Sequence, residues 1–280
     1  MAIVLNPINP VAFSVFGLPI RWYALAYIAG FIFGYFIFKH FTQRDNAEIR
    51  FSNKQLDDFL TYVVLGVILG GRLGYVLFYN LPFFIENPLE IFMLWHGGMS
   101  FHGGLLGVIF ATFLFAYKQK FTDKSFVRNS FRILDVLAVG APIGLGLGRI
   151  ANFINMEVMG RATNSPIGVI FNGVPEYAYP RHASPLYEAT LEGGVLFIIL
   201  WLFYTKTNLK HNPGAISGLL GMFYAVFRIF CEQFRQPDAQ IGFLTSWGLT
   251  MGQMLSGLMF VVGATIFIYA IRNSKKNCIV

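Results

Sequence analysis

Seven apolar runs, each close to the length of a membrane-spanning helix, dominate this sequence. A helix needs about 20 mostly apolar residues to cross the hydrocarbon of a bilayer. Only 12% of the residues are charged, about half the roughly 25% of an average soluble domain, so too few are present to cover a globular surface. We predict an all-α integral membrane protein, a bundle of about seven transmembrane helices that forms a single domain over residues 1–280. The runs fall near residues 22–38, 59–79, 102–117, 133–150, 188–204, 214–231 and 249–271.

The basic residues sort between the two sides that seven spans would separate. Of the 21 lysines and arginines, fourteen fall in the loops of one side, four arginines fall on the other side, and three arginines fall inside spans. By the positive-inside rule the lysine-rich side is cytoplasmic, which places the N-terminus outside and the C-terminus in the cytoplasm. Outer loop segments are then expected near residues 80–101, 151–187 and 232–248.

Polar side chains from five of these spans fall at one depth. Counted from the cytoplasmic ends at about 1.5 Å per residue, they lie roughly 20 to 24 Å up, in the outer half of a hydrocarbon layer about 30 Å thick. An arginine at the bilayer centre costs about 2.5 to 3.5 kcal/mol and so needs a partner or a function. The residues at this level are Tyr23, Arg72, His102, Arg149 and Arg228.

Two interpretations of this level are open. One is a set of internal salt bridges, and Arg228 and Glu232 have the spacing to pair along one helix. However, the outer and buried arginines outnumber the acidic residues at that depth. We therefore expect a polar cavity in the outer half of the membrane, with positive charge left for an anionic phospholipid headgroup, since guanidinium groups bind phosphate well.

The sequence WHGGMSFHGGLLG, residues 95–107, places two histidines six residues apart, each followed by two glycines. Glycine pairs let the backbone bend, so we expect a re-entrant or broken segment that lines a cavity. His102 is either a structural hydrogen-bonding residue or a proton acceptor beside the arginines. His96 follows an interfacial tryptophan and is expected to be positional.

Polar residues also crowd the outer end of the fourth run. Arg149 and Asn152 lie one helical turn apart, and Glu157 returns to the same side if the helix continues. They either orient the arginine and bind headgroup hydroxyls or satisfy a frayed helix end. The segment PRHASPLYEA, residues 180–189, is either a substrate contact or an ordinary interfacial loop.

Other features point to packing rather than chemistry. The small-xxx-small spacings of Gly30 with Gly34 and of Gly66 with Gly70 indicate helix packing. Cys231 lies in an apolar run and Cys278 in a basic tail, and no metal-ligand spacing is present. We expect no metal site and no disulfide.

Residues 148–160, GRIANFINMEVMG, resemble the signature G-R-x-(G or A)-N-F-apolar-N-x-E-x-x-G of the bacterial phosphatidylglycerol:prolipoprotein diacylglyceryl transferases at every defined position. Further segments are similar to the family's other motifs in the same order, so the resemblance covers nearly the whole chain. In one segment the family usually has R-H-P-S-Q-L-Y-E, and here Ala183 and Pro185 replace proline and glutamine. The further segments are RWY (21–23), GGRLGYVLFYN (70–80), GGMSFHGG (97–104) and FRQPDAQ (234–240).

The resemblance implies a reaction and a location. The family transfers the diacylglyceryl group of phosphatidylglycerol to the thiol of the lipobox cysteine of exported preprolipoproteins, which forms a thioether and releases glycerol phosphate. The expected place is the bacterial cytoplasmic (inner) membrane, with the active site facing the outer leaflet or periplasm. No cofactor, metal or nucleic acid is expected, and the oligomeric state stays open. The competing functions are an anionic phospholipid transporter or scramblase without covalent chemistry, and a structural scaffold.

The resemblance also implies roles for individual residues. His102 would take the thiol proton, because a thiol with a pKa near 8.5 is mostly protonated at neutral pH. Arg149 and Arg235 would meet the charge that develops on the departing phosphate. The residues expected to bind or orient substrate are Tyr23, Arg72, Gly103, Gly104, Asn152, Glu157 and Gly160. Whether Arg72, Arg161 and Arg228 bind lipid or only brace helices is left open.

Overall fold

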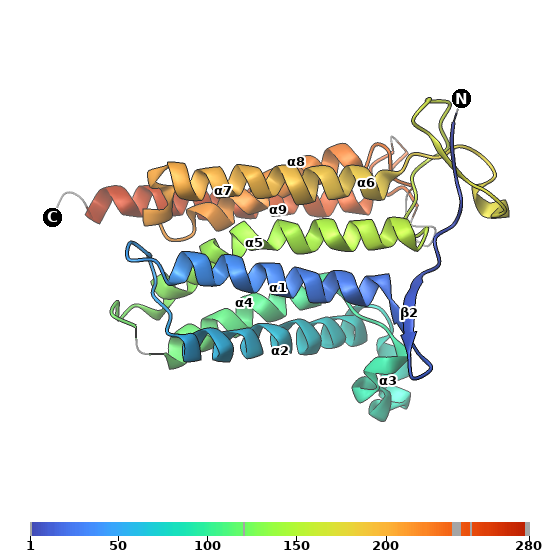
Figure 1. Cartoon of the computed structure of the whole chain (residues 1–280). Helices are drawn as coiled ribbons and strands as arrows, with labels where there is room; N and C mark the ends of the chain where they lie inside the picture. Colours follow the sequence, from blue (N-terminus) through green and yellow to red (C-terminus); the bar gives the residue numbers. More distant parts are fainter. Residues whose placement is uncertain (1, 120, 237–241, 247, 278–280) are drawn as a thin grey trace. The chain divides into compact units, whose positions relative to one another are not determined.

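Long apolar helices make up most of the structure, a computed structural model that describes residues 2–119, 121–236, 242–246 and 248–277 (Figure 1). Each predicted apolar run forms a helix, which confirms an all-α integral membrane protein. Six helical segments are long and apolar enough to span a membrane, and the seventh, α8, has 17 residues. The segments are α1 (Trp22–Thr42), α2 (Asn53–Phe78), α4 (Phe101–Lys118), α5 (Phe126–Ile154), the continuous α6 (Ser184–Glu188), η4 (Ala189–Val195) and α7 (Leu196–Lys206), α8 (Ala215–Cys231) and α9 (Met251–Asn277).

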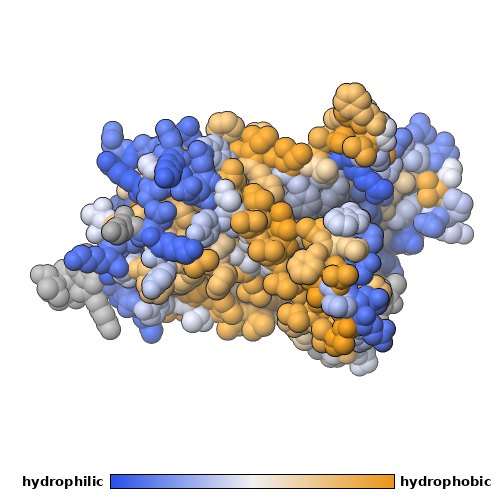
Figure 2. Space-filling model, turned by 90° about the horizontal axis from the view of Figure 1, so that it is seen from below, coloured by the Kyte–Doolittle hydropathy of each residue, from blue (hydrophilic) through white to orange (hydrophobic). Residues whose placement is uncertain are grey.

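Short elements precede and connect these helices. Strand β1 pairs in parallel with β4, and β2 pairs with β3 in an antiparallel hairpin. On the face drawn in Figure 2, hydrophobic side chains gather over the helices and hydrophilic ones gather toward the helix ends, as lipid contact requires. The short elements are β1 (Ile3–Leu5), β2 (Val11–Val15), β3 (Leu18–Arg21), α3 (Leu81–Glu86), η1 (Pro88–Phe92), η2 (Leu94–His96), β4 (Val169–Phe171), η3 (Pro175–Tyr177) and η5 (Asn208–His211).

The chain divides into two compact units, Lys39–Leu134 and the combination of Met1–Phe38 with Asp135–Val280. In the first unit α2 and α4 lie side by side through facing glycines (Figure 1). A Cβ atom on Gly70 would lie 2.8 Å from Gly107 Cα, and one on Gly74 would lie 2.7 Å from Gly103 Cα. Neither position has room for a side chain, so the two backbones touch directly.

The second unit contains α7, α8 and α9, which also lie side by side (Figure 1). Asp135 on α5 is buried and caps the start of α8: its carboxylate accepts hydrogen bonds from Gly214 N at 2.7 Å, Ser217 N at 2.8 Å and Ser217 Oγ at 2.7 Å. The first turn of a helix leaves backbone N–H groups without intrahelical partners, and this carboxylate supplies acceptors for them. The cap fixes α8 against α5.

The expectation of a broken segment at residues 95–107 is corrected in part. The second HGG triplet is regular helix, because Ser100 accepts a hydrogen bond from Gly103 N and starts α4 at Phe101. Helix α5 is likewise regular to Ile154, even though Pro142 lies inside it. The irregular backbone lies earlier, where Gly97 and Gly98 both have φ of +81°.

Candidate active site

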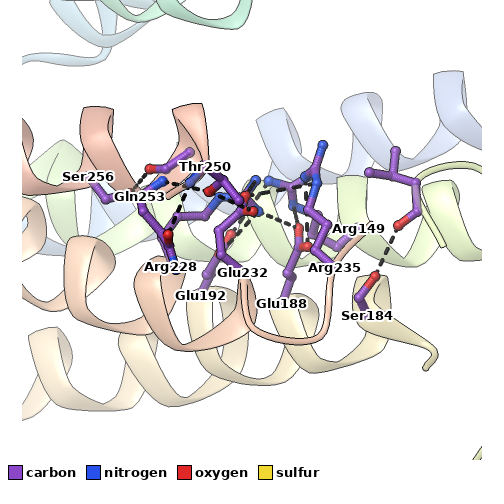
Figure 3. Close-up of polar contacts among 12 residues, drawn as sticks. Arg149, Ser184, Glu188, Glu192, Arg228, Glu232, Arg235, Thr250, Gln253 and Ser256 are labelled. Atoms are coloured by element: carbon purple, nitrogen blue, oxygen red, sulfur yellow. Dashed lines mark hydrogen bonds and ion pairs between the residues drawn. The ribbon is translucent and has the colours of Figure 1, made fainter. Parts of the chain in front are cut away.

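Six charged residues of the second unit meet in one cluster, called here the ion-pair cluster (Figure 3). Its cations come from α5, from α8 and from the residues just after α8. Its carboxylates come from α6, from η4 and from the C-terminal end of α8. The members are Arg149, Arg228, Arg235, Glu188, Glu192 and Glu232.

Glu188 is the centre of the ion-pair cluster. Its Oε2 atom lies 2.8 Å from Arg149 Nε and 3.0 Å from Arg228 Nη1, and its Oε1 atom lies 3.8 Å from Arg235 Nη1. The Glu188 side chain is fully buried, with an exposed fraction of 0%. One carboxylate thus joins arginines from three parts of the chain.

Glu192 and Glu232 complete the cluster. Glu192, also fully buried, lies 3.6 Å from Arg149 Nη2 and 3.7 Å from Arg228 Nη1. Glu232 Oε1 lies 2.6 Å from Arg228 Nη2, which confirms the predicted pair along one helix. Thr250 Oγ1 donates a hydrogen bond to Glu232 Oε2 at 3.2 Å, and this links the cluster to the start of α9 (Figure 3).

The local backbone explains why Glu192 reaches the arginines. Residues Ala189–Val195 form a π-helical segment, a rare element that is frequent at functional sites. A Cβ atom on Gly193 would lie 2.7 Å from Gly146 Cα, so this segment and α5 approach each other backbone to backbone. Glu192 is therefore held beside the helix that carries Arg149.

The charges balance within the ion-pair cluster, whereas the surplus of positive charge expected over the whole level stays a prediction. The ion-pair cluster contains three arginines and three glutamates, so its formal charges cancel. Glu192 was missed as a partner. An acidic residue inside the apolar run 188–204 is itself a sign of a functional or paired position, and it lies four residues after Glu188.

Asn152 and Glu157 come together, but not because the helix continues. Helix α5 ends at Ile154, and Met156 and Val158 take left-handed backbone conformations with φ of +56° and +59°. The turn brings Glu157 back, where it accepts hydrogen bonds from Asn152 Nδ2 at 3.0 Å and Asn155 Nδ2 at 3.3 Å. The signature thus forms a closed polar loop at the end of α5.

Gly160 is held between two other segments of the chain. It forms an antiparallel bridge with Arg235, and its N–H donates to the carbonyl of His182 at 2.9 Å. A Cβ atom on Gly160 would lie 2.6 Å from His182 O and 2.5 Å from Phe234 O. The close approach that this glycine permits is made by the protein's own backbone, and it fixes Arg235 next to the signature loop.

Arg161 and Arg181 brace the same region. Arg161 Nε donates to the carbonyl of Arg235 at 2.9 Å, and Arg181 Nη1 donates to the carbonyl of Gly160 at 3.1 Å. Burial lowers the pKa of His182, whose Nδ1 lies 3.2 Å from Tyr187 Oη. These contacts hold the RHASPLYE segment in place, and its Pro185 lies in the first turn of α6, a position that suits proline.

The contacts of Arg72 favour helix bracing over substrate binding, the two roles left open for it. The guanidinium is buried and donates to five backbone carbonyls, namely those of Glu90, Ile91, Met93, Gly97 and Gly98. An arginine has five N–H donors, so none is left for a phosphate. The side chain instead holds the irregular segment before α4 against α2.

The HGG residues lie in the first turn of α4, in the unit Lys39–Leu134. Gly103 and Gly104 face α2, which gives them a helix-packing role. His102 is exposed, and its ring lies 5.6 Å from that of Phe101. Its role as a base therefore stays a prediction.

Tyr23 lies in the first turn of α1, where its ring lies 5.2 Å from that of Tyr27. The predicted role of Tyr23 in orienting the substrate stays a prediction.

Two further predictions concern residues away from the ion-pair cluster. The last four residues of the FRQPDAQ motif, Pro237, Asp238, Ala239 and Gln240, lie outside the described residues. Among the described residues, no three histidine, cysteine, aspartate or glutamate side chains gather as metal ligands.

Comparison with known proteins gives one consistent result. The family model for prolipoprotein diacylglyceryl transferase matches residues 10–269. A phosphatidylglycerol–prolipoprotein diacylglyceryl transferase of Rhodospirillum rubrum is 49% identical over 95% of this chain and 93% of its own length. Proteins with the same name from Azospirillum brasilense and Bradyrhizobium diazoefficiens are 47% and 48% identical, over 97% and 96% of this chain and 98% and 94% of their own. With its signature arginine held among buried carboxylates and a match over nearly its whole length, the chain belongs to the prolipoprotein diacylglyceryl transferase family.

Proposed function

We propose that this chain transfers the diacylglyceryl group of phosphatidylglycerol to the thiol of the lipobox cysteine of exported preprolipoproteins, forming a thioether and releasing glycerol phosphate. Residues 1–280 act as one transferase domain in the bacterial inner membrane, with the active site facing the outer leaflet or periplasm. Family membership supports the reaction, and the lysine-rich loops support the orientation.

The observation that carries this proposal is the setting of Arg149. It lies inside the family signature, and with an exposed side-chain fraction of 21% it is more open than Arg228 at 11% or Arg235 at 12%. A lipid phosphate can therefore reach Arg149 while its Nε atom stays bound to Glu188. Arg235, which lies 3.8 Å from the same carboxylate, would also meet the phosphate charge.

The reaction exchanges one bond for another. The sulfur attacks the diacylglyceryl carbon that carries the phosphate, the carbon–oxygen bond breaks, and its electron pair leaves on the phosphate oxygen. His102 accepts the thiol proton, because the thiolate is the nucleophile. Preorganised arginines stabilise the charge that grows on the leaving group, and such electrostatic stabilisation is usually the largest contribution to catalysis.

The test is mass spectrometry of a lipobox peptide incubated with phosphatidylglycerol and the purified protein in detergent. We expect a diacylglyceryl adduct on the cysteine from the native protein, and none from a folded Arg149→Ala variant. Arg50→Ala, which removes a surface arginine paired with Asp45, is the matched control and should stay active. Bound anionic lipid without any adduct from folded native protein would contradict the proposal and favour lipid transport.

A further inference from the structure

Two buried carboxylates hold the arginines at different distances. Glu188 Oε2 lies 2.8 Å from Arg149 and 3.0 Å from Arg228, whereas the Glu192 carboxylate oxygens lie 3.6 Å and 3.7 Å from the same two residues. Glu192 meets Arg149 at Nη2, while Glu188 meets it at Nε. The ion pair at Nη2 of Arg149 is therefore longer and weaker than the ion pair at its Nε atom.

The charges of the ion-pair cluster cancel before any substrate arrives. A phosphodiester brings one negative charge, and the glycerol phosphate that leaves carries about −1.5 to −2 at neutral pH. The product is therefore more anionic than the substrate lipid. Arginines with no counter-charge would hold it more tightly than the substrate, and turnover would stall at product release.

We infer that Glu192 is an exchangeable counter-charge for Arg149. When the substrate binds, Arg149 Nη2 turns from Glu192 to the substrate phosphate. After the reaction, Glu192 competes with glycerol phosphate for Arg149, so that the product leaves. This inference rests on the proposed function and deepens it. Glu188 keeps Arg149 in place throughout the exchange. Glu192 is a positioning residue that sets the affinity for the anionic product and does not touch the reacting atoms.

The test compares Glu192→Gln with Glu192→Asp, because the first removes the charge and the second keeps it. We expect glycerol 1-phosphate to inhibit the Gln variant at about a tenfold lower concentration than the native protein, since one nearby negative charge is gone. Its first turnover should stay fast and its later turnovers should slow. The Asp variant should stay within about twofold of the native inhibition constant.

A merely structural role for Glu192 predicts the opposite pattern. A disturbed pocket would bind glycerol 1-phosphate more weakly or equally and would slow the first turnover, and either result in a folded Gln variant would overturn the inference. Should that variant not fold, Glu192→Met, which is uncharged and similar in volume, takes its place with the same expectation. Failure of both to fold would also overturn it, because Glu192 would then be a structural anchor of the cluster and not an exchangeable counter-charge.

Failure of the proposed function is distinguishable from failure of this inference. If the native protein formed no adduct, the transferase proposal would fall. Calorimetric binding of glycerol 1-phosphate to the native protein and to the Gln variant would still test the counter-charge, because that measurement needs no turnover.

Discussion

Arg149 Nε lies 2.8 Å from the Oε2 atom of Glu188, a carboxylate with no exposed surface. The same oxygen also lies 3.0 Å from Arg228. Removing one member of a buried ion pair leaves the other charge without compensation, which is far more costly than losing a surface salt bridge. The position of the signature arginine therefore depends on a residue outside the signature.

Glu188→Gln tests this dependence. We expect kcat/KM for phosphatidylglycerol to fall by roughly 100-fold, because Arg149 and Arg228 lose their shared anchor. We also expect the free energy of unfolding to fall by about 3 kcal/mol. Initial rates with a lipobox peptide and thermal unfolding in detergent measure the two effects.

The matched control for Glu188 is Glu176→Gln, which removes an exposed carboxylate from η3 in the same unit. It should change neither rate nor stability measurably. A folded Glu188→Gln variant that kept its activity within threefold would show that the arginines hold their positions without Glu188.

Arg72→Lys separates bracing from substrate binding. A lysine offers three donors in place of five and lacks the planar fork, so several of the carbonyls between Glu90 and Gly98 would lose their partner. We expect a loss of about 2 kcal/mol in unfolding free energy and faster proteolysis of that segment. KM for phosphatidylglycerol should stay within about twofold.

Arg50→Lys is the control for Arg72, because Arg50 is exposed and pairs only weakly with Asp45 at 3.8 Å. Its stability should match that of the native protein. A large rise in KM for Arg72→Lys without any loss of stability would show that Arg72 binds the substrate and does not only brace the helices.

The spans, the Arg228–Glu232 pair and the glycine packing of α2 on α4 could be predicted from the sequence, because each depends on local spacing. The charge balance of the ion-pair cluster could not. It depends on the π-helical segment, which sets the direction of Glu192, and on the contact between Gly193 and Gly146, which joins segments about 50 residues apart. The five carbonyls that Arg72 binds could not be predicted either, because backbone acceptors leave no sign in a sequence.

Gly160→Ala tests whether the signature loop needs the close approach of backbone segments. The added methyl group would lie 2.6 Å from His182 O and 2.5 Å from Phe234 O, so one of these segments must shift. We expect a clear fall in melting temperature and in activity, because Arg235 is bridged to this residue. Gly144→Ala, where nothing lies within 4 Å of the new methyl group, is the control and should be neutral or slightly stabilising. Equal melting temperatures for the two variants would contradict the packing argument.

His102→Gln tests the base. Glutamine keeps a polar side chain at this exposed position in the first turn of α4 but cannot accept a proton, so we expect turnover to fall by about 10² to 10⁴. The deficit should shrink as pH approaches the thiol pKa near 8.5, because the peptide then supplies thiolate without help. The control is His96→Gln. The native His96 imidazole pairs with Glu90 at 2.7 Å, and this variant should keep the native rate. A deficit that stays constant between pH 7 and pH 9 would assign His102 to substrate positioning, since a misplaced substrate gains nothing from a larger thiolate fraction.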